Sequence, residues 1–347
     1  MRVLALETSC DETSAAVVTR AGDVVTLEGL AILSQDIHRI FGGVVPELAS
    51  RAHLSTVGPV VDLALREAGV ELAKIDGIAV TRGPGLLGAL LVGVTWAKTV
   101  AWREQKSLIG VHHLEGHLFA PTLEAPDVAP PFTALLVSGG HTMLLDVPAW
   151  GEYRLLGETR DDAVGEAFDK VGTLLGLDYP AGAAMERLAA QGDPARFAFP
   201  RPLLKGVPEK DQFAFSFSGL KTALLRAVQQ SADLAGDRAD LARGFQDAAI
   251  EVLATKTARA AAAFNRPMVV LGGGVACNRA LAEATRRAVG AQVRVAVASP
   301  RLNTDNAAMI GAAGSWRLAQ GESHGIDLDA RDSFPLPGLV TTTGVTP

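Results

Sequence analysis

The chain has 347 residues, 48% of them apolar and 20% charged, which is a globular composition with length for about two domains. The formal net charge of −6 argues against a broad nucleic-acid or anionic-membrane platform, and two distant cysteines, Cys10 and Cys277, exclude a disulfide framework and fit a reducing cytosol. No stretch has the length and apolar character of a signal peptide or membrane helix, so we expect a cytoplasmic protein without membrane contact.

The chain opens with a strand, a polar turn and a second strand. Apolar runs at 3–6 and 15–18 flank a turn that carries Asp11 and Glu12, as expected of a β-hairpin. The same pattern returns at 133–147, where TALLV, SGGH and TMLLDV follow one another. Two such openings, about 130 residues apart, predict two lobes of similar build.

Helices and buried strands alternate through the rest of the chain. The pattern predicts helices at 46–68, 86–103, 160–176, 181–191, 219–232 and 239–264, and strands at 77–81, 107–111, 268–271 and 293–298. This alternation indicates α/β layers with mainly parallel sheets. The final segment, 321–347, is rich in Pro and Thr without a period, and we expect a loosely held tail.

The glycine-rich segment GPGLLG, residues 83–88, matches the GxGxxG spacing of dinucleotide-binding turns. Pro84 removes one backbone N–H from a phosphate cradle, and the next strand ends in His112 and His113 instead of an acidic ribose ligand. Tight packing of a helix on a strand is therefore the better interpretation. The sequence contains no GxxxxGK[ST], which excludes a P-loop.

The segment HHLEGH, residues 112–117, carries three of the seven histidines. On a helix, His113 and His117 leave one face four positions apart, where they can share a metal ion. Glu115 lies about 200° around that helix from His113 and points away, which disfavours a HExxH-type metalloprotease. Asp305 precedes an Ala- and Gly-rich helix, where it suits either an N-cap or a third metal ligand.

Three features of the second half are compatible with a nucleotide. Gly139 and Gly140 lie between two strands and expose backbone N–H groups that suit a phosphate, although an ordinary glycine hairpin has the same pattern. LGGGVACN, residues 271–278, is a buried strand that ends in glycines before a helix. Asp169 belongs to the acidic face of a helix, and periodicity cannot decide between a ribose ligand and a solvated face.

Nine blocks of the sequence resemble one family and occur in its order. They are ETSCDET, GGVVPELASRAH, GPGLLGALLVG, HHLEGH, LLVSGGHT, GEAFDKVGTLLG, FSFSGLKTAL, LGGGVACNRAL and TDNAAMIG. They are similar to the TsaD family of tRNA N6-adenosine threonylcarbamoyltransferases, whose archaeal and eukaryotic relatives form the catalytic subunit of KEOPS. The resemblance covers about residues 1–320, and GETRDDAVGEAFDK looks like the bacterial branch.

This resemblance implies two ribonuclease-H-like lobes of the actin, sugar-kinase and chaperone ATPase type, with a nucleotide cleft between them. We expect an N-terminal lobe at 1–130, a C-terminal lobe at 131–320 and the tail at 321–347. The implied reaction moves threonylcarbamoyl from threonylcarbamoyl-adenylate to N6 of adenosine 37, in tRNAs that read codons beginning with A, and releases AMP. A non-catalytic actin-like ATP-binding switch and a metalloprotease are the alternatives.

The resemblance also implies site residues and partners. His113, His117 and Asp305 are the expected ligands of one divalent metal, iron(II), with zinc as the alternative. The expected substrate-binding residues are Leu136, Val137, Ser138, Gly139 and Gly140 for the phosphate and acyl part, and Asp169, Gly182, Glu186 and Asn278 for the adenosine. The family often has PGG after Tyr179, whereas this chain has Pro180-Ala181-Gly182. The expected partners are tRNA, the adenylate donor, and the proteins TsaB and TsaE.

The acceptor nitrogen sets the chemical difficulty, because the N6 lone pair is delocalised into the adenine ring. Positioning and metal polarisation should carry much of the rate, and a base must remove the N6 proton as attack proceeds. Asp11 and Glu12, at the tip of the first hairpin, are the candidate bases. The alternative is that Asp11 only shapes the turn.

Overall fold

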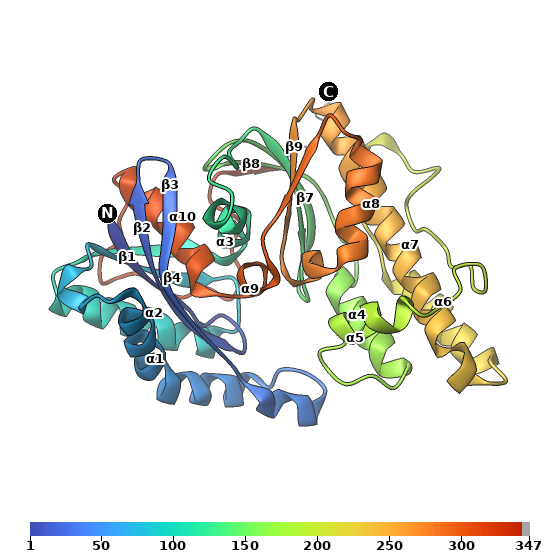
Figure 1. The fold of residues 1–347 in the computed structure, drawn as a ribbon, viewed down its shortest axis with the longest axis horizontal. Helices are drawn as coiled ribbons and strands as arrows, with labels where there is room; N and C mark the ends of the chain where they lie inside the picture. The colour runs from blue at the N-terminus through green and yellow to red at the C-terminus, as the bar shows by residue number, and fades with distance from the viewer. Residues whose placement is uncertain (342–347) are drawn as a thin grey trace. The chain divides into compact units, whose positions relative to one another are not determined.

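The computed structural model describes residues 1–341 (Figure 1). The contacts divide the chain into two compact units: unit 1 comprises residues 1–129 and 298–337, and unit 2 comprises 130–297 and the chain from 338. Within the described residues, no helix combines the length and apolar character needed to cross a membrane.

Unit 1 is built on a five-stranded sheet of order β3-β2-β1-β4-β5. Its strands are β1 (Arg2–Glu7), β2 (Glu12–Ala21), β3 (Val24–Ser34), β4 (Gly77–Gly83) and β5 (Ser107–His112). The first three are antiparallel neighbours, whereas β4 and β5 run parallel to β1. The predicted opening hairpin is therefore confirmed, and β3 extends it.

Alternation along β1 divides its side chains between two helical layers. Leu4 and Leu6 pack in one core with α1 (Pro46–Ala68) and α2 (Leu87–Arg103), close to the predicted bounds. On the other face lies α10 (Ala307–Ala319). The helix can approach the sheet closely because Gly311 has no side chain: a Cβ there would lie 3.2 Å or less from Val18 and Ala5. The other helical elements of unit 1 are η1 (Asp36–Phe41), η2 (Leu72–Lys74), α3 (His113–Phe119), η3 (Ala120–Leu123) and α9 (Pro300–Asn303).

Unit 2 repeats this arrangement on a six-stranded sheet of order β10-β9-β6-β7-β8-β11. β6, β7 and β8 are antiparallel neighbours, and β9 and β10 run parallel to β6, as β4 and β5 do to β1. The predicted repeat and the ribonuclease-H-like fold class are thereby confirmed. The strands are β6 (Phe132–Val137), β7 (Thr142–Ala149), β8 (Glu152–Glu158), β9 (Met268–Gly272), β10 (Arg294–Val297) and β11 (Leu339–Thr341).

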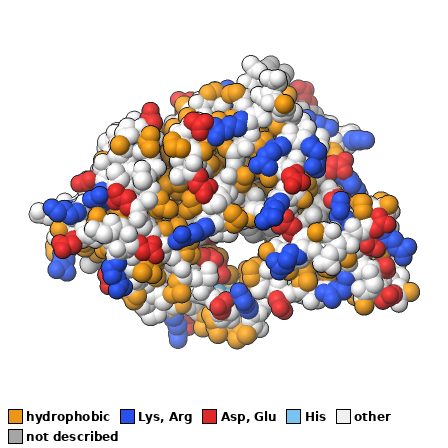
Figure 2. All heavy atoms as spheres, in the orientation of Figure 1, with side chains coloured by type: hydrophobic (Ala, Val, Ile, Leu, Met, Phe, Trp, Pro, Cys, Tyr) orange, Lys and Arg blue, Asp and Glu red, His pale blue; other side chains and the backbone are white. Residues whose placement is uncertain are grey.

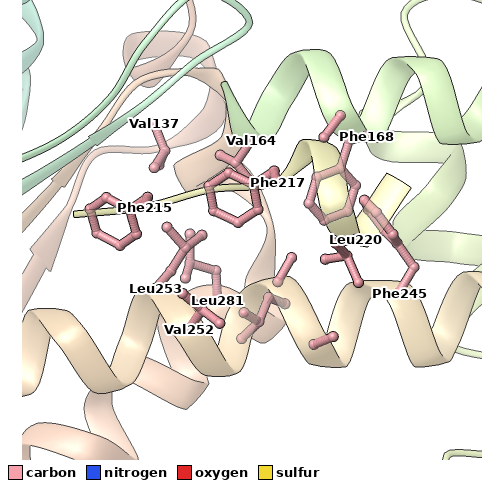
Figure 3. Packing of buried hydrophobic residues seen from close by; sticks show 14 of the residues in the cluster. Val137, Val164, Phe168, Phe215, Phe217, Leu220, Phe245, Val252, Leu253 and Leu281 are labelled. Carbon is pink, nitrogen blue, oxygen red and sulfur yellow. The ribbon is translucent and has the colours of Figure 1, made fainter. Parts of the chain in front are cut away.

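The helices of unit 2 form one large core with its sheet. Figure 3 shows Phe168 and Phe245 in it, whose rings meet edge to face, with Phe217 and then Phe215 further along the same core. The helix predicted at 160–176 is shorter, because Arg160 still donates its backbone N–H to Phe215 before the helix begins. The helical elements are α4 (Val164–Leu174), α5 (Gly182–Ala189), η4 (Glu209–Asp211), α6 (Ser218–Gln230), α7 (Leu234–Ala263), η5 (Gly274–Cys277) and α8 (Arg279–Val289).

The predicted lobe boundary at 320 differs from the observed division, because the chain returns to unit 1 at residue 298. The physical reason is α10, whose glycines fit it against the first sheet. The expected loose tail also differs over 321–337, where His324 pairs with Leu108 and Arg331 donates to the carbonyl of Arg82. Residues 342–347 of that tail lie outside the described part of the chain.

The glycines of 83–88 serve packing, as the sequence indicated. At Gly85, with φ of +159°, a Cβ would lie 2.6 Å from the carbonyl oxygen of Ser9. A Cβ at Gly88 would lie 2.5 Å from the hydroxyl of Ser50 on α1. The backbone of Leu86 also donates to Ser9, so this turn fixes the start of the first hairpin loop.

Candidate functional site

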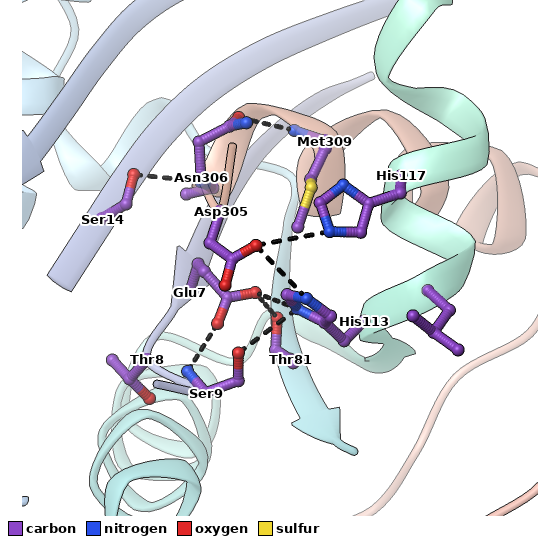
Figure 4. A network of polar contacts seen from close by, with 12 residues as sticks. Glu7, Thr8, Ser9, Ser14, Thr81, His113, His117, Asp305, Asn306 and Met309 are labelled. Carbon is purple, nitrogen blue, oxygen red and sulfur yellow. Dashed lines mark hydrogen bonds and ion pairs between the residues drawn. The ribbon is translucent and has the colours of Figure 1, made fainter. Parts of the chain in front are cut away.

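Two histidines and an aspartate converge in unit 1 (Figure 4). β5 ends at His112 and α3 begins at His113, so His113 and His117 leave one helical face, as predicted, with ring centroids 4.8 Å apart. Asp305 Oδ1 lies 3.4 Å from Nε2 of His113 and 3.3 Å from Nε2 of His117. The i,i+4 prediction is confirmed, and the distant aspartate completes a compact cluster.

Asp305 is held by the start of α10. The N-cap of this helix is Asn306, whose side chain accepts from the backbone N–H of Met309 and donates to the carbonyl of Leu302. Ser14 on β2 accepts the N–H of Ala307 at 2.9 Å. Asn306 therefore takes the capping role considered for Asp305, and the Asp305 carboxylate is directed at the histidines.

A buried carboxylate, Glu7, supports His113 from behind. Its Oε2 lies 3.1 Å from Nδ1 of His113 and accepts from the hydroxyl of Thr81 at 2.6 Å, while its Oε1 accepts from the backbone of Ser9 at 2.5 Å. A carboxylate at Nδ1 holds the proton there, so that Nε2 is the nitrogen that a metal ion would bind once it displaces the other proton. Sequence reasoning missed Glu7, whose one signal is a charge at the end of a buried strand.

Burial and charge set the protonation states of the cluster. Burial lowers the pKa of His113, but the carboxylates of Asp305 and Glu7 outweigh it and raise that pKa well above its usual value. Burial, together with the neighbouring His113, lowers the pKa of His117. Against burial, the two imidazoles hold the pKa of Asp305 far below its usual value. Asp305 is therefore ionised and His117 neutral, as metal ligands must be, whereas His113 is protonated without a metal ion and would release one proton when it binds one.

The donor set fits a metal ion. Two imidazole nitrogens and a carboxylate suit a divalent first-row metal and leave coordination positions for substrate oxygens. Both ring nitrogens of His117 are buried and make no hydrogen bond with the described residues. A cation bound by Nε2 would satisfy one of these otherwise orphaned atoms. We therefore regard the cluster as a candidate metal centre.

The tip of the first hairpin is rigid. His53 on α1 donates from Nε2 to the carbonyl of Cys10 at 2.9 Å, and its Nδ1 accepts from Thr13 at 2.8 Å. Burial, with the nearby charges of Asp305 and Asp11, raises the pKa of Glu12 to about 9. Without a metal ion at Asp305, the Glu12 carboxyl is therefore protonated at neutral pH, and a protonated carboxyl is a poor base.

The phosphate-binding residues expected in unit 2 lie at the end of β6. Leu136 and Val137 are buried strand residues, so only their backbone could contact a ligand. In the following turn Ser138 donates its N–H to His141 at 2.8 Å, and Gly139 and Gly140 have open space where a side chain would be. The loop that follows β9, the parallel neighbour of β6, lies against the end of β6. A Cβ at Gly273 in that loop would lie only 2.4 Å from the carbonyl oxygen of Val137. Ligands of open α/β sheets bind at such carboxyl ends.

The adenosine candidates interact through neighbouring residues. Asp169 on α4 accepts the backbone N–H of Ala181, next to Gly182 at the start of α5, at 2.8 Å. Burial raises the pKa of Asp169, and this N–H partly offsets the shift. The Ala181 side chain packs on Gly172, where a Cβ would lie 2.2 Å from the Ala181 Cβ, so the departure from PGG is accommodated.

The two remaining adenosine candidates meet at the start of α8. Glu186 on α5 accepts the backbone N–H of Arg279 at 2.8 Å. Asn278 is the N-cap of α8, accepts from Leu281 and donates to Gln246 of α7 at 2.8 Å. Gln246, a buried amide inside a long helix, carried no sequence signal.

Glu115 faces away from the metal cluster, as its helical position predicts. It forms two hydrogen bonds with Arg317 on α10, at 2.6 and 2.7 Å. A carboxylate engaged in this way cannot act as the base of a protease at His113 and His117.

Comparison with known proteins yields consistent likenesses. Residues 26–312 match the family model described as TsaD: tRNA N6-adenosine threonylcarbamoyltransferase. Proteins of that name from Gemmatimonas aurantiaca and Syntrophotalea carbinolica are 59% and 54% identical to the chain, over 98% and 97% of both lengths. Component A of the (R)-2-hydroxyglutaryl-CoA dehydratase of Acidaminococcus fermentans shares the fold, with a TM-score of 0.54 at 13% identity, over 92% of this chain and 99% of its own.

Proposed function

The chain belongs to the TsaD family of tRNA N6-adenosine threonylcarbamoyltransferases, and on that premise we propose that it moves threonylcarbamoyl from threonylcarbamoyl-adenylate to N6 of adenosine 37, in tRNAs that read codons beginning with A, and releases AMP. It is a tRNA-modifying transferase. The observation that carries the proposal is the cluster of His113, His117 and Asp305, because it brings metal-ligand donors together on the family's own sequence blocks. This assignment leaves no support for an ATP-binding switch or a protease.

We propose iron(II) as the resident metal, with zinc as the alternative, since both accept imidazole and carboxylate ligands. When bound, the ion would polarise substrate oxygens as a Lewis acid. The side chains His113, His117 and Asp305 would hold it, and Glu7 would keep the proton of His113 on Nδ1. Metal analysis of protein purified without oxygen decides between the two ions.

The donor would lie against unit 2. The backbone N–H groups of Gly139 and Gly140 would hold its phosphate and acyl oxygens, because the two glycines leave the turn open, and Leu136, Val137 and Ser138 would lie beside them. Asp169, Gly182, Glu186 and Asn278 would hold its adenosine. The side chain of Asn278 already caps α8 and contacts Gln246, so its share in binding would be to fix the wall of the adenosine site.

Asp11 is the proposed general base. Its carboxylate would accept the N6 proton as the bond from N6 to the carbamoyl carbon forms and the bond to the AMP phosphate breaks. The anchoring of the tip by His53 keeps this group in place. Glu12, protonated near neutral pH, would contribute no basicity while the metal is absent.

Protein partners fit the surface of unit 1. Large apolar side chains are exposed on α1 and α2, among them Leu54, Leu63, Leu87 and Leu91. We propose that TsaB and TsaE act with this chain, in the cytoplasm. Lys and Arg are interspersed with Asp and Glu on the face seen in Figure 2, which suits tRNA binding that is shared with partners.

The test combines depletion with reconstitution. Mass spectrometry of tRNA nucleosides after depletion should show loss of N6-threonylcarbamoyladenosine and accumulation of unmodified adenosine. Wild-type protein should restore the modification, whereas the His113→Ala, His117→Ala double variant should not. Unchanged modification after complete depletion contradicts the proposed function.

A further inference from the structure

A second cluster of polar side chains in unit 1 encloses a cavity of about 200 Å³ that the proposed reaction does not use. It lies beside the edge strand β5 and is lined by Arg82, His112, Arg317, Glu322, His324 and Phe334. Because one water occupies about 30 Å³ of the liquid, this space has room for a polyatomic ion.

The hydrogen bonds of His324 are in conflict unless a further acceptor is present. The backbone N–H of Gly110, on the edge strand, donates to Nδ1 at 3.2 Å, while Nη1 of Arg82 lies 3.3 Å from Nε2. A neutral imidazole accepts at only one nitrogen, and burial, together with the charge of Arg82, lowers the pKa of His324. With Nδ1 engaged by the backbone, Nε2 carries the hydrogen. Two donors then face each other.

Arg82 also lacks an acceptor. Its Nε is buried and has no hydrogen-bond partner within residues 1–341, and no carboxylate of those residues lies at ion-pair distance. Its guanidinium lies 5.2 Å from the centre of the Phe334 ring, which forms one wall of the cavity. Gly110 makes room for this side chain, since a Cβ there would lie 2.9 Å from Cδ of Arg82.

The surrounding charges leave Arg82 as the cation available to a ligand. Arg317 is occupied, because Glu115 binds it twice and Glu322 accepts from its Nη1 at 2.7 Å. The charges of Arg331 and Asp329 act on the Arg82 guanidinium in opposite directions. The remaining histidine, His112, is satisfied at both nitrogens, by the carbonyl of Phe334 and the N–H of Leu114.

We propose that this cavity binds a small oxyanion of the phosphate type, with Nη1–H of Arg82 and Nε2–H of His324 as its donors. The guanidinium keeps its positive charge at all relevant pH values and donates hydrogen bonds only, which suits an oxyanion. An oxygen between Nη1 of Arg82 and Nε2 of His324 would accept from both and so resolve the opposed donors. The site is separate in its residues from the metal ligands and from the proposed donor site.

The test uses inorganic phosphate and the full chain stripped of metal. Titration calorimetry should detect a saturable site that depends on Arg82, and Arg82→Gln should weaken it by about 10–100-fold, the effect of losing a hydrogen bond to a charged group. His324→Phe should weaken it as well. The matched control is Arg103→Gln, an exposed arginine at the end of α2, which should bind phosphate like wild type.

Nuclear magnetic resonance of the arginine Nε–H groups locates the ion independently of affinity. Phosphate should shift the Arg82 signal and leave that of Arg103 unchanged. Dimethyl phosphate, as a second probe, distinguishes the source: tighter binding of inorganic phosphate supports a free ion, and equal binding supports a nucleic-acid phosphodiester. Absence of saturable binding, or an unchanged affinity in folded Arg82→Gln and His324→Phe, overturns the proposal.

Discussion

Replacing Glu7 by glutamine tests whether this buried carboxylate sets the tautomer of His113. Glu7 accepts three hydrogen bonds, from Ser9, Thr81 and His113. Glutamine has the same shape but one acceptor oxygen and one NH2 donor. If its oxygen faces His113, the NH2 opposes the N–H of Ser9. If the amide is flipped, the NH2 faces Nδ1 and drives the proton to Nε2, which then cannot bind a metal.

The size of the effect follows from these two orientations. Loss of the partner that orients a metal-bound histidine costs about 10–100-fold in metal affinity, or roughly 1.4–2.7 kcal/mol. A buried donor left without an acceptor costs the metal-free protein about 1–3 kcal/mol of unfolding free energy. Glu7→Gln should therefore weaken both metal binding and stability.

The assay is competition between the metal-free protein and a chromophoric chelator for zinc or cobalt, with chemical unfolding measured in parallel. The matched control is Thr81→Val, which removes one hydrogen bond to Glu7 but leaves the carboxylate facing His113. It should lose stability to a similar degree and metal affinity much less. Wild-type metal affinity in Glu7→Gln, or equal losses of affinity in both variants, would refute the tautomer argument.

Four further predictions concern the other site residues. His113→Ala and His117→Ala should each remove the metal and the transfer activity, while the circular dichroism spectrum stays that of the native protein. A folded double variant that retains stoichiometric metal would contradict the proposed metal site. Asp169→Ala should weaken calorimetric nucleotide affinity by roughly 1.5–3 kcal/mol, the scale of a hydrogen bond to a charged group, and unchanged affinity would make it a surface residue. Asp11→Asn should lower the transfer rate by about 10²–10⁴-fold at saturating substrates, with metal content and donor affinity retained; a near wild-type rate would leave it a turn residue. Glu12→Gln tests a pH dependence. The pKa of Glu12 is raised to about 9 in the folded protein, so the metal-free wild type loses stability as the pH rises from the pKa of an unfolded glutamate toward 9. This group contributes at most ~1.4 kcal/mol of that loss per pH unit. The variant should show a shallower fall in denaturant titrations, and parallel profiles would contradict the shift.

Local patterns in the sequence were sufficient for most elements of the fold. The helix over 46–68 and both hairpins follow from periodicity and turn residues, and the structure has them at nearly those bounds. The histidine pair was predictable for the same reason, because a four-residue spacing within HHLEGH needs nothing beyond one helical turn.

Long-range contacts were beyond that reasoning. Glu7 reaches His113 only because β1 and β5 both flank β4 in one sheet, and a lone sequence gives no register for parallel strands. The predicted lobe boundary differs from the observed one for a related reason. The helix α10 is apolar on nearly all sides, so its composition predicts that it is buried but not which sheet it covers. His324 and Arg82 likewise meet only because the segment after α10 pairs with the edge of β5.

The return of the chain to unit 1 is what completes the candidate metal centre. His113 and His117 come from the helix that follows β5, whereas Asp305 follows β10, a strand of unit 2, in the sequence. The aspartate is fixed only when α10 lies on the first sheet, since Ser14 on β2 holds the N–H of Ala307 and Asn306 caps the helix. A helix that seemed to belong with unit 2 in sequence thus supplies the carboxylate to unit 1. The same packing places Arg317 against Glu115 on the far side of the histidine helix. The packing of α10 on the first sheet therefore also places the third ligand of the candidate metal centre.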